Sequence, residues 1–310
     1  MKRSDQLITR VRKMTQNVTF TDDSGIQDDE ILQGLNDGQE RIFSLILDEH
    51  SSLFQKEKEI DAVANQANYS LPNDVYLGTR IERVEYSNSG RPQQYYPLRQ
   101  VELWERDQFE TGLPYLYVRR SGEILIQPTP RSPGKIRVTY QKKIPKLDKR
   151  RAKVLAVTLS GSGITSLTLD TTLEIDSESL IDEGYFTVVD KDGVVQMQAI
   201  PVDEINTTSG VVTVSSGFAF EDDETISVGD WLCTGKFSST HSLLDDICEK
   251  YMLAYAKWEV FKIDSNSDSQ ERALELSQIE QQIVGSYSEA DHDIDRIPLI
   301  SSDFLITDWD

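Results

Sequence analysis

Residues 112–130 read GLPYLYVRRSGEILIQPTP, and this stretch decides the fold of the region around it. Two short runs rich in aromatic and β-branched residues flank a Ser-Gly turn, and prolines stand before the first run and after the second. This pattern predicts a β-hairpin over residues 115–128 that proline stops at both ends. The hairpin contains no catalytic motif, so it indicates a structural role.

Further strands are predicted on both sides of the hairpin, from about residue 56 to 147. Short alternating runs separated by Gly and Pro signals predict a small antiparallel sheet. The runs are YSLPND (69–74), RIERVEYS (80–87) and KIRVTYQKK (135–143). In the last run, Ile136, Val138 and Tyr140 share one face. We expect residues 97–109 to form a short helix laid across this sheet.

Both ends of the chain show helical periodicity. Residues 28–48 carry an apolar face, and residues 241–264 and 269–287 predict an αα-hairpin with a broad apolar stripe. Because that stripe is wide enough to need a third helix, we expect the 28–48 helix to pack on it. Gly34 and Gly38 either weaken this helix or mark a close approach to another backbone. A short amphipathic helix precedes it, with the cations Lys2, Arg3, Arg10, Arg12 and Lys13.

The basic run KLDKRRAK at 146–153 marks a boundary. Beyond it, residues 154–236 carry Val, Ile, Leu and Thr strands between Ser, Gly and Asp turns, which predicts an inserted all-β domain, a small barrel or sandwich. The expected fold is α+β. A core of residues 1–153 and 237–290 holds the helical bundle and the small β element, and an extended arm follows at 291–310.

The chain has 310 residues, a net charge of −21 and a pI near 4.5. Binding to nucleic acid requires Lys and Arg to neutralise phosphates, so this balance argues against a protein that grips DNA. It is compatible with a surface past which DNA slides, or simply with solubility. The sequence has no apolar stretch long enough for a membrane span and no signal-peptide core. Its two cysteines, Cys233 and Cys248, form no disulfide framework, which favours a reducing compartment.

No motif for catalysis, cofactor binding or metal binding rises above a structural explanation. His50, His241 and His292 have no partner at metal-ligand spacing and are expected to be exposed or capping residues. GSGIT at 161–165 lacks the Lys of a phosphate-binding loop and predicts a β-turn. DKDG at 190–193 lacks the later ligands of a calcium loop. We therefore expect no enzyme, no cofactor and no metal.

The last residues, 291–310, mix apolar side chains with acids and lack a helix signal. Such a tail is either disordered or docks on a partner as a strand or an apolar plug, and its apolar content favours docking. The side chains expected to make this contact are Ile297, Leu299, Phe304, Ile306 and Trp309. In the hairpin, Arg119 and Arg120 are the charges expected to meet an acidic neighbour.

These features together resemble the head-to-tail adaptor proteins (connector or head-completion proteins) of tailed bacteriophages, particularly the short-tailed types. The pattern G-x-P-x-x-Y, G-x-I-x-I-x-P-x-P and I-x-V-x-Y carries the resemblance. It falls on Gly112, Pro114, Tyr117, Gly122, Ile124, Ile126, Pro128, Pro130, Ile136, Val138 and Tyr140. The resemblance covers about 27–147 and the helices at 241–287. The insert at 154–236 departs from simple adaptors, so its role is not carried over.

The resemblance implies a structural virion protein at the head–tail junction, made in the host cytoplasm. It implies a homo-oligomeric ring, commonly a dodecamer, that joins the portal to the tail and surrounds the DNA channel during genome retention and ejection. The implied partners are the portal protein, other copies of the chain, and tail proteins such as a nozzle, tubular or fibre component. DNA would pass through without specific binding, and no membrane would be involved.

Two other hypotheses stay open at this point. In one, the insert is the recognition head of a binding module for carbohydrate or tail-fibre attachment, on a phage tail or a cell surface. In the other, carboxylates from separate segments form an acid-pair hydrolase. Glycan binding by the insert would favour the first, and turnover of a polysaccharide would favour the second.

Overall fold

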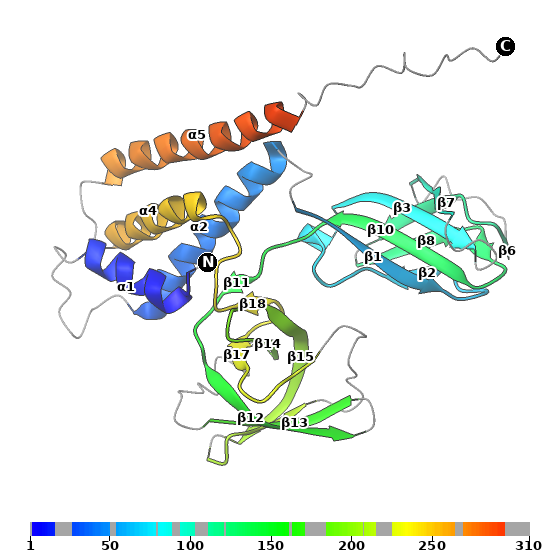
Figure 1. Cartoon of the computed structure of the whole chain (residues 1–310), viewed down its shortest axis with the longest axis horizontal. Coiled ribbons are helices and arrows are strands. Elements are labelled where there is room, and N and C mark those ends of the chain that lie inside the picture. Colours follow the sequence, from blue (N-terminus) through cyan, green and yellow to red (C-terminus); the bar gives the residue numbers. More distant parts are fainter. Residues whose placement is uncertain are drawn as a thin grey trace, which may run out of the picture. The chain divides into compact units, whose positions relative to one another are not determined.

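The structure, a computed structural model, divides into two compact units, residues 1–50 with 244–310 and residues 51–243 (Figure 1). It describes residues 2–15, 27–49, 54–78, 80–88, 94–102, 111–120, 122–160, 163–170, 184–206, 208–214, 225–263 and 269–294. Helices and sheets both occur in this part of the chain, which confirms the predicted α+β class. None of the described helices combines the length and the apolar composition that a membrane crossing needs.

The first unit is built from helices at both ends of the chain. They are α1 (Ser4–Met14), α2 (Asp28–Glu49), α4 (Asp246–Ile263) and α5 (Ser269–Ile294). At the start of α2, the Gln27 N–H donates to Glu30 Oε2 at 2.8 Å, and the acids of the first turn favour the helix dipole. On the predicted apolar face Leu45 is half-buried, and the fully buried members are Ile31, Leu35, Ile42 and Ile46.

Two glycines allow α2 to lie very close to α4. A Cβ atom at Gly34 would lie 3.2 Å from the Cα of Ala256, and one at Gly38 would lie 3.0 Å from the Cβ of Tyr255. Atoms rarely approach a Cβ so closely, so a side chain at either position would force the facing part of α4 to shift. Of the two explanations that the sequence left open, the close approach is correct.

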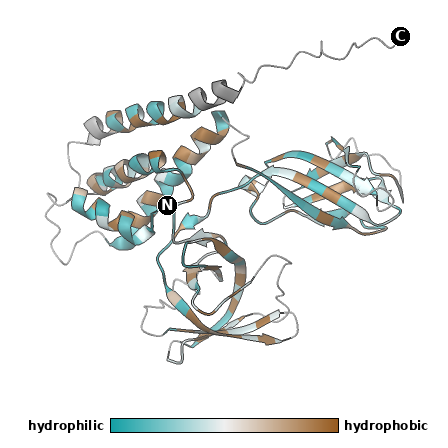
Figure 2. Ribbon diagram, in the orientation of Figure 1, coloured by the Kyte–Doolittle hydropathy of each residue, from teal (hydrophilic) through white to brown (hydrophobic). Residues whose placement is uncertain are grey.

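The second unit begins with two facing β-sheets, where the sequence predicts one. The strand orders are β1-β10-β3-β4 and β2-β8-β7-β5. The first sheet contains β1 (Gln55–Ala62), β10 (Gly134–Gln141), β3 (Ile81–Asn88) and β4 (Tyr96–Pro97). The second contains β2 (Asn68–Ser70), β8 (Glu123–Gln127), β7 (Leu116–Arg120) and β5 (Arg99–Gln100). The predicted face of Ile136, Val138 and Tyr140 is 0% exposed in the cluster between them, and Figure 2 shows the strands banded by hydropathy.

The quoted hairpin forms the centre of the second sheet. β7 and β8 pair antiparallel, and Gly122 at the turn has a φ of 72°, a conformation that favours glycine. Three consecutive residues of each strand are buried, which means that both faces of the hairpin are covered. One face (Tyr117, Ile124 and Ile126) lies in the core between the sheets, and the other (Leu116, Val118 and Leu125) packs with Val101 in a separate cluster.

The helix predicted over 97–109 is wrong in its described part. Pro97 belongs to β4, Arg99–Gln100 form β5, and residues 103–110 lie outside the described residues. The Arg99 N–H donates to the Tyr115 carbonyl at 2.9 Å, so this segment pairs with the hairpin edge. Pairing with a distant strand satisfies the hydrogen-bonding groups of this backbone, and the local helix pattern is too weak to compete with that pairing.

The described strands also form two short parallel ladders. They join β6 (Thr111–Gly112) to β9 (Thr129–Pro130) and β11 (Lys146–Leu147) to β18 (Ser238–Ser239). A single turn of 3-10 helix, η2, covers Tyr76–Gly78.

The inserted β-domain is a closed six-stranded barrel with the order β12-β13-β16-β15-β14-β17. Its strands are β12 (Ala152–Ser160), β13 (Gly163–Leu169), β14 (Tyr185–Val189), β15 (Val195–Asn206), β16 (Val211–Val214) and β17 (Trp231–Thr234). β12 and β17 close it, with Ala152 opposite Leu232. Of the barrel and the sandwich that the sequence left open, the barrel is correct.

The helix predicted from residue 241 begins later, at Asp246. The preceding residues leave the barrel in extended form, because Ser238–Ser239 pair with β11 and the His241 N–H donates to Ser239 Oγ at 3.1 Å. His241 is only 8% exposed, so the expectation of an exposed or capping histidine is wrong for this residue. Its ring packs over Gly193, where any side chain would collide with it.

Candidate partner-binding surfaces

The side chains expected to dock the tail lie outside the described residues. They are Ile297, Leu299, Phe304, Ile306 and Trp309. The helical pattern was expected to stop after Ala290, whereas α5 continues to Ile294. The segment available as an arm therefore begins at residue 295.

Arg119 and Arg120 occupy the turn end of β7, and both are exposed. In the strand register, Arg120 lies opposite Glu123 of β8. Burial raises the pKa of Tyr117, and the charge of Arg119 acts against that rise, so Arg119 lies near the tyrosine hydroxyl. The two guanidinium groups are thus held by a hairpin that is buried on both faces.

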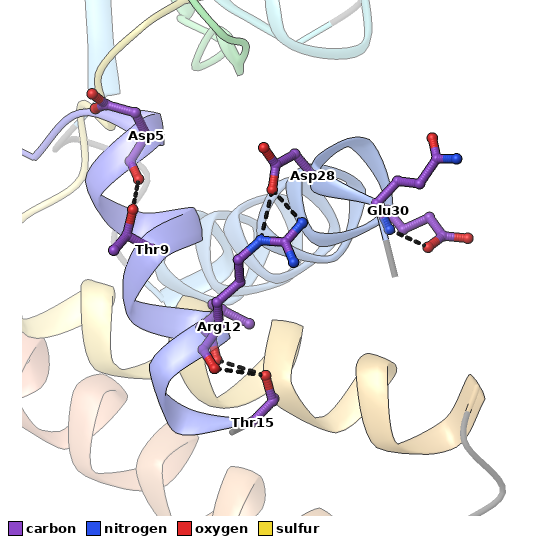
Figure 3. A network of polar contacts seen from close by, with 8 residues as sticks. Asp5, Thr9, Arg12, Thr15, Asp28 and Glu30 are labelled. Atoms are coloured by element: carbon purple, nitrogen blue, oxygen red, sulfur yellow. Dashed lines mark hydrogen bonds and ion pairs between the residues drawn. The ribbon is translucent and has the colours of Figure 1, made fainter. Parts of the chain in front are cut away.

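The cations at the N-terminus bind within the helical unit. Lys2 Nζ contacts both carboxylate oxygens of Glu249 in α4, at 2.6 and 2.9 Å, and Arg10 pairs with the same carboxylate. Arg12 Nε and Nη2 donate to Asp28 Oδ1 of α2 at 2.8 and 2.6 Å (Figure 3). These charges oppose the overall balance of the chain, and they fasten α1 to its neighbours.

A strongly basic segment joins the two-sheet region to the barrel. Residues 142–153, KKIPKLDKRRAK, hold seven cations and one acid; this net +6 leaves −27 on the rest of the chain. We call residues 142–153 the basic linker. Its strand β11 pairs with β18, so the chain that enters the barrel runs beside the chain that leaves it.

The single acid of the basic linker is already satisfied. Asp148 is 4% exposed. Its Oδ1 accepts from Arg151 Nη2 at 2.8 Å, and its Oδ2 accepts from the backbone N–H and Oγ1 of Thr234 at 2.7 and 2.8 Å. These bonds hold the start of the barrel to its end.

Four lysines gather where the basic linker meets the chain leaving the barrel, and we call them the lysine cluster. They are Lys142, Lys143, Lys146 and Lys236. Burial lowers the pKa of Lys143; Asp74 opposes this shift, and the charges of Lys236 and Lys146 reinforce it. Burial and the charge of Lys56 likewise lower the pKa of Lys142, against the effect of Asp74. Like charges therefore lie close together in a partly desolvated site.

The carboxylate that acts on both lysines is engaged elsewhere. Asp74 is 4% exposed and accepts from Tyr140 Oη at 2.6 Å and from Lys56 Nζ at 2.9 Å. Burial acts to raise its pKa, but the hydrogen bonds from Tyr140 and Lys56, together with the charges of Lys56 and Lys142, lower the pKa overall. Among the described residues, no member of the lysine cluster forms an ion pair with a carboxylate.

Aromatic rings alternate with the cations of this region. Lys143 Nζ lies 4.9 Å from the centre of the Phe237 ring, and Lys236 Nζ lies 4.3 Å from that of Tyr185. The Arg150 guanidinium lies 4.6 Å from the centre of the Trp231 ring. Each distance falls within the range of a cation–π contact.

The described residues show no catalytic arrangement. Burial raises the pKa of Cys248 to about 11 and also raises that of Cys233 well above its ordinary value, so both thiols stay protonated at neutral pH. His50 and the side chain of His292 lie outside the described part of the chain. Within that part, no group of three or more His, Cys, Asp or Glu side chains is placed to hold a metal ion.

A family model described as "SU10 adaptor protein" matches residues 3–160, just over half of the 310 residues. The chain belongs to the SU10 adaptor protein family. The resemblance to phage head-to-tail adaptors that the sequence indicates is thereby confirmed. The match covers α1, α2, the two facing sheets and the basic linker, and it ends with β12. No curated protein matches the chain.

This adaptor is a structural protein of a bacteriophage, found at the head–tail junction and associated with portal and tail components. Sequence reasoning singled out the hairpin and the tail, but it missed the lysine cluster. The sequence marks the run at 146–153 only as a boundary. Lys236 lies far from this run in sequence and joins the cluster only because β18 pairs with β11 in the fold.

Proposed function

We propose that this adaptor assembles into a dodecameric ring that joins the portal to the tail and surrounds the DNA channel during genome retention and ejection. The observation that supports the proposal most directly is the family match over residues 3–160. Its partners are the portal protein, other copies of the chain, and a nozzle, tubular or fibre protein of the tail. No catalysis is part of this function.

The charge balance supports the channel role. A net charge of −21 on each copy gives the ring a strongly negative field. Like charge keeps the DNA phosphates from adhering, so DNA passes without specific binding. The cations of the N-terminal segment support the same conclusion, because Lys2, Arg10 and Arg12 pair with acids of their own unit.

Two sets of residues make the contacts between proteins in this proposal. The tail docks on a partner through Ile297, Leu299, Phe304, Ile306 and Trp309, as an extended strand or an apolar plug. Arg119 and Arg120, held on the rigid hairpin, meet an acidic neighbour. A closed ring requires each copy to present two different surfaces, and a tail with a separate receptor meets that requirement.

The proposal is tested by mixing the full chain with its portal protein and measuring particle mass and shape by mass photometry and electron microscopy. We expect a closed ring seated on the portal. A chain truncated after Ile294 keeps α5 and should stay folded but no longer join. A full chain that never forms a ring with the portal would refute the function, and a truncated chain that assembles normally would refute only the docking tail. If the full chain instead binds glycans without assembling, the β-domain is a recognition module.

A further inference from the structure

We propose that the lysine cluster of the basic linker binds the acidic C-terminal tail, residues 295–310, of a second copy of this chain. This inference rests on the proposed self-assembly and deepens it by naming the receptor for the tail. It also assigns a role to Lys142, Lys143, Lys146 and Lys236.

The first argument is that positive charge is concentrated at the lysine cluster. Lys143 Nζ lies 4.9 Å from the centre of the Phe237 ring, and the Lys146 N–H donates to the carbonyl of Phe237, the residue that follows Lys236. Three positive charges therefore lie close together, and the partial burial of Lys143 makes its charged form less favourable. Asp74 offsets part of this repulsion, but its carboxylate is also bound by Tyr140 and Lys56, and Asp148 is bound by Arg151 and Thr234. An acidic segment from outside the described part of the chain would therefore meet a local concentration of positive charge here.

The second argument is that the tail has the matching chemistry. Residues 295–310 contain four aspartates and one arginine, a net charge of −3. Three of the acids stand directly beside aromatic residues, in Asp303-Phe304 and Asp308-Trp309-Asp310. The cluster presents cations over aromatic rings, with Lys143 over Phe237 and Lys236 over Tyr185. Carboxylates of the tail can pair with the ammonium groups while its rings add cation–π and apolar contact.

The third argument separates an acidic peptide from nucleic acid. Outside the basic linker, the chain carries −27, so a long polyanion that reaches the lysine cluster also meets a repulsive field from the rest of the molecule. A short segment with a few carboxylates avoids most of that repulsion. The lysine cluster is local, as a short acidic peptide requires, and is not a long basic track such as a duplex follows.

The fourth argument concerns the second copy. Sixteen residues fully extended span roughly 50 Å, which is long enough to reach a neighbouring subunit. Copies that each carry −21 repel one another, so their association needs a local pairing of opposite charges. A tail on one copy and a lysine cluster on the next form a heterologous contact, which can continue around a ring.

The experiment measures binding of a fluorescent peptide of residues 295–310 to the full chain by anisotropy at low ionic strength. We expect saturable binding that weakens as salt is added, because exposed ion pairs are screened. Replacing Lys142, Lys143, Lys146 and Lys236 with Gln should weaken binding roughly tenfold or more, given modest contributions from each pair. The matched control replaces Lys13, Lys58, Lys135 and Lys257 with Gln, which removes the same charge elsewhere and should leave binding near that of the wild type.

Several outcomes would overturn the inference. They are equal binding by the cluster variant and the wild type, equal loss in the control, and unchanged binding of a peptide whose aspartates are replaced by asparagine. A labelled DNA duplex that binds through the four lysines while the peptide does not would assign the site to nucleic acid. To separate a second copy from the same chain, the mass of the full chain is followed with concentration. A chain that stays monomeric, and binds the peptide only after truncation at Ile294, would show that the tail binds its own copy.

The failure of this inference and that of the proposed function are distinguishable. Rings that form on the portal with the cluster variant as well as with the wild type would leave the ring intact and refute the lysine cluster as receptor. Peptide binding that depends on the lysines, in a protein that never forms a ring with the portal, would support the contact and refute the ring.

Discussion

Replacing Gly38 with Ala should destabilise the helical unit, although Ala is the better helix former. The Ala Cβ would lie 3.0 Å from Tyr255 Cβ and 3.3 Å from Met252 Cα, so α2 and α4 would have to move apart. Overpacking of this kind costs about 1–3 kcal/mol. The gain in helix propensity of about 1 kcal/mol offsets part of that cost. We expect a net loss of roughly 1 kcal/mol in the free energy of unfolding.

The matched control is Gly285→Ala in α5. No atom lies within 4 Å of the Cβ that would be added there, so only the propensity gain remains. Gly285→Ala should therefore stabilise the same unit by roughly 0.5–1 kcal/mol. The same substitution is thus expected to change the free energy of unfolding in opposite directions at Gly38 and Gly285. Urea unfolding followed by far-ultraviolet circular dichroism measures both, because the described α-helices all belong to this unit. If Gly38→Ala raises the midpoint as Gly285→Ala does, the close contact between α2 and α4 is refuted.

Two more perturbations test other contacts. Burial acts to raise the pKa of Glu280, but the hydrogen bonds from Arg41 and Tyr251 and the charge of Arg41 lower the pKa overall. The ionised Glu280 therefore stabilises the folded state above its ordinary pKa of 4.5, and this stabilisation is lost as pH falls through the lowered pKa. The difference in melting temperature between wild type and Glu280→Gln should therefore be large near neutral pH and shrink below about pH 4.5, and a constant difference would contradict this. In the barrel, Gly193 has a φ of 82° and contacts the His241 ring, so Gly193→Ala should lower stability by about 2 kcal/mol or more in unfolding followed by Trp fluorescence. Gly229→Ala, with a φ of 105° but its nearest contact at 3.9 Å, adds only backbone strain, and an equal loss in both variants would show that the histidine contact is unimportant.

Strand and helix periodicity predicted the elements whose signal is local. The alternation in KIRVTYQKK correctly assigned Ile136, Val138 and Tyr140 to one buried face, because successive side chains of a strand point to opposite sides. In α2, the helical period likewise identified Ile31 and Ile46 as buried. The turn residues around the hairpin and the strand-rich insert were also sufficient to predict β structure there.

The failures share one physical cause, which is competition from distant segments. Pro97 and Arg99–Gln100 lie in strands, and the backbone of Arg99 pairs with the hairpin at Tyr115. The chain before α4 stays extended because Ser238–Ser239 find partners in β11, and this also buries His241. The free-energy difference between the helix and strand propensities of these residues is smaller than the stabilisation that such pairing provides through hydrogen bonds and burial. Propensity therefore does not decide the conformation of these segments.

For the candidate surfaces, the structure shows Arg119 and Arg120 exposed, while their expected acidic neighbour and the partner of the tail stay predictions. The lysine cluster was beyond sequence reasoning. Lys142, Lys143 and Lys146 are neighbours in sequence, but only the fold brings Lys236 to them and shows that Asp74 is already engaged. Spacing along a chain does not report which counter-ions are occupied.

By itself, the sequence determined the charge of the chain, the type of most elements and the family pattern around the hairpin. Each of these depends on composition or on a period of a few residues. Only the tertiary structure decided that the hairpin is buried on both faces, that Gly34 and Gly38 mark a close helix contact, and that four lysines share one site. A period identifies one buried face of an element, but what covers the other face depends on contacts between residues far apart in the chain.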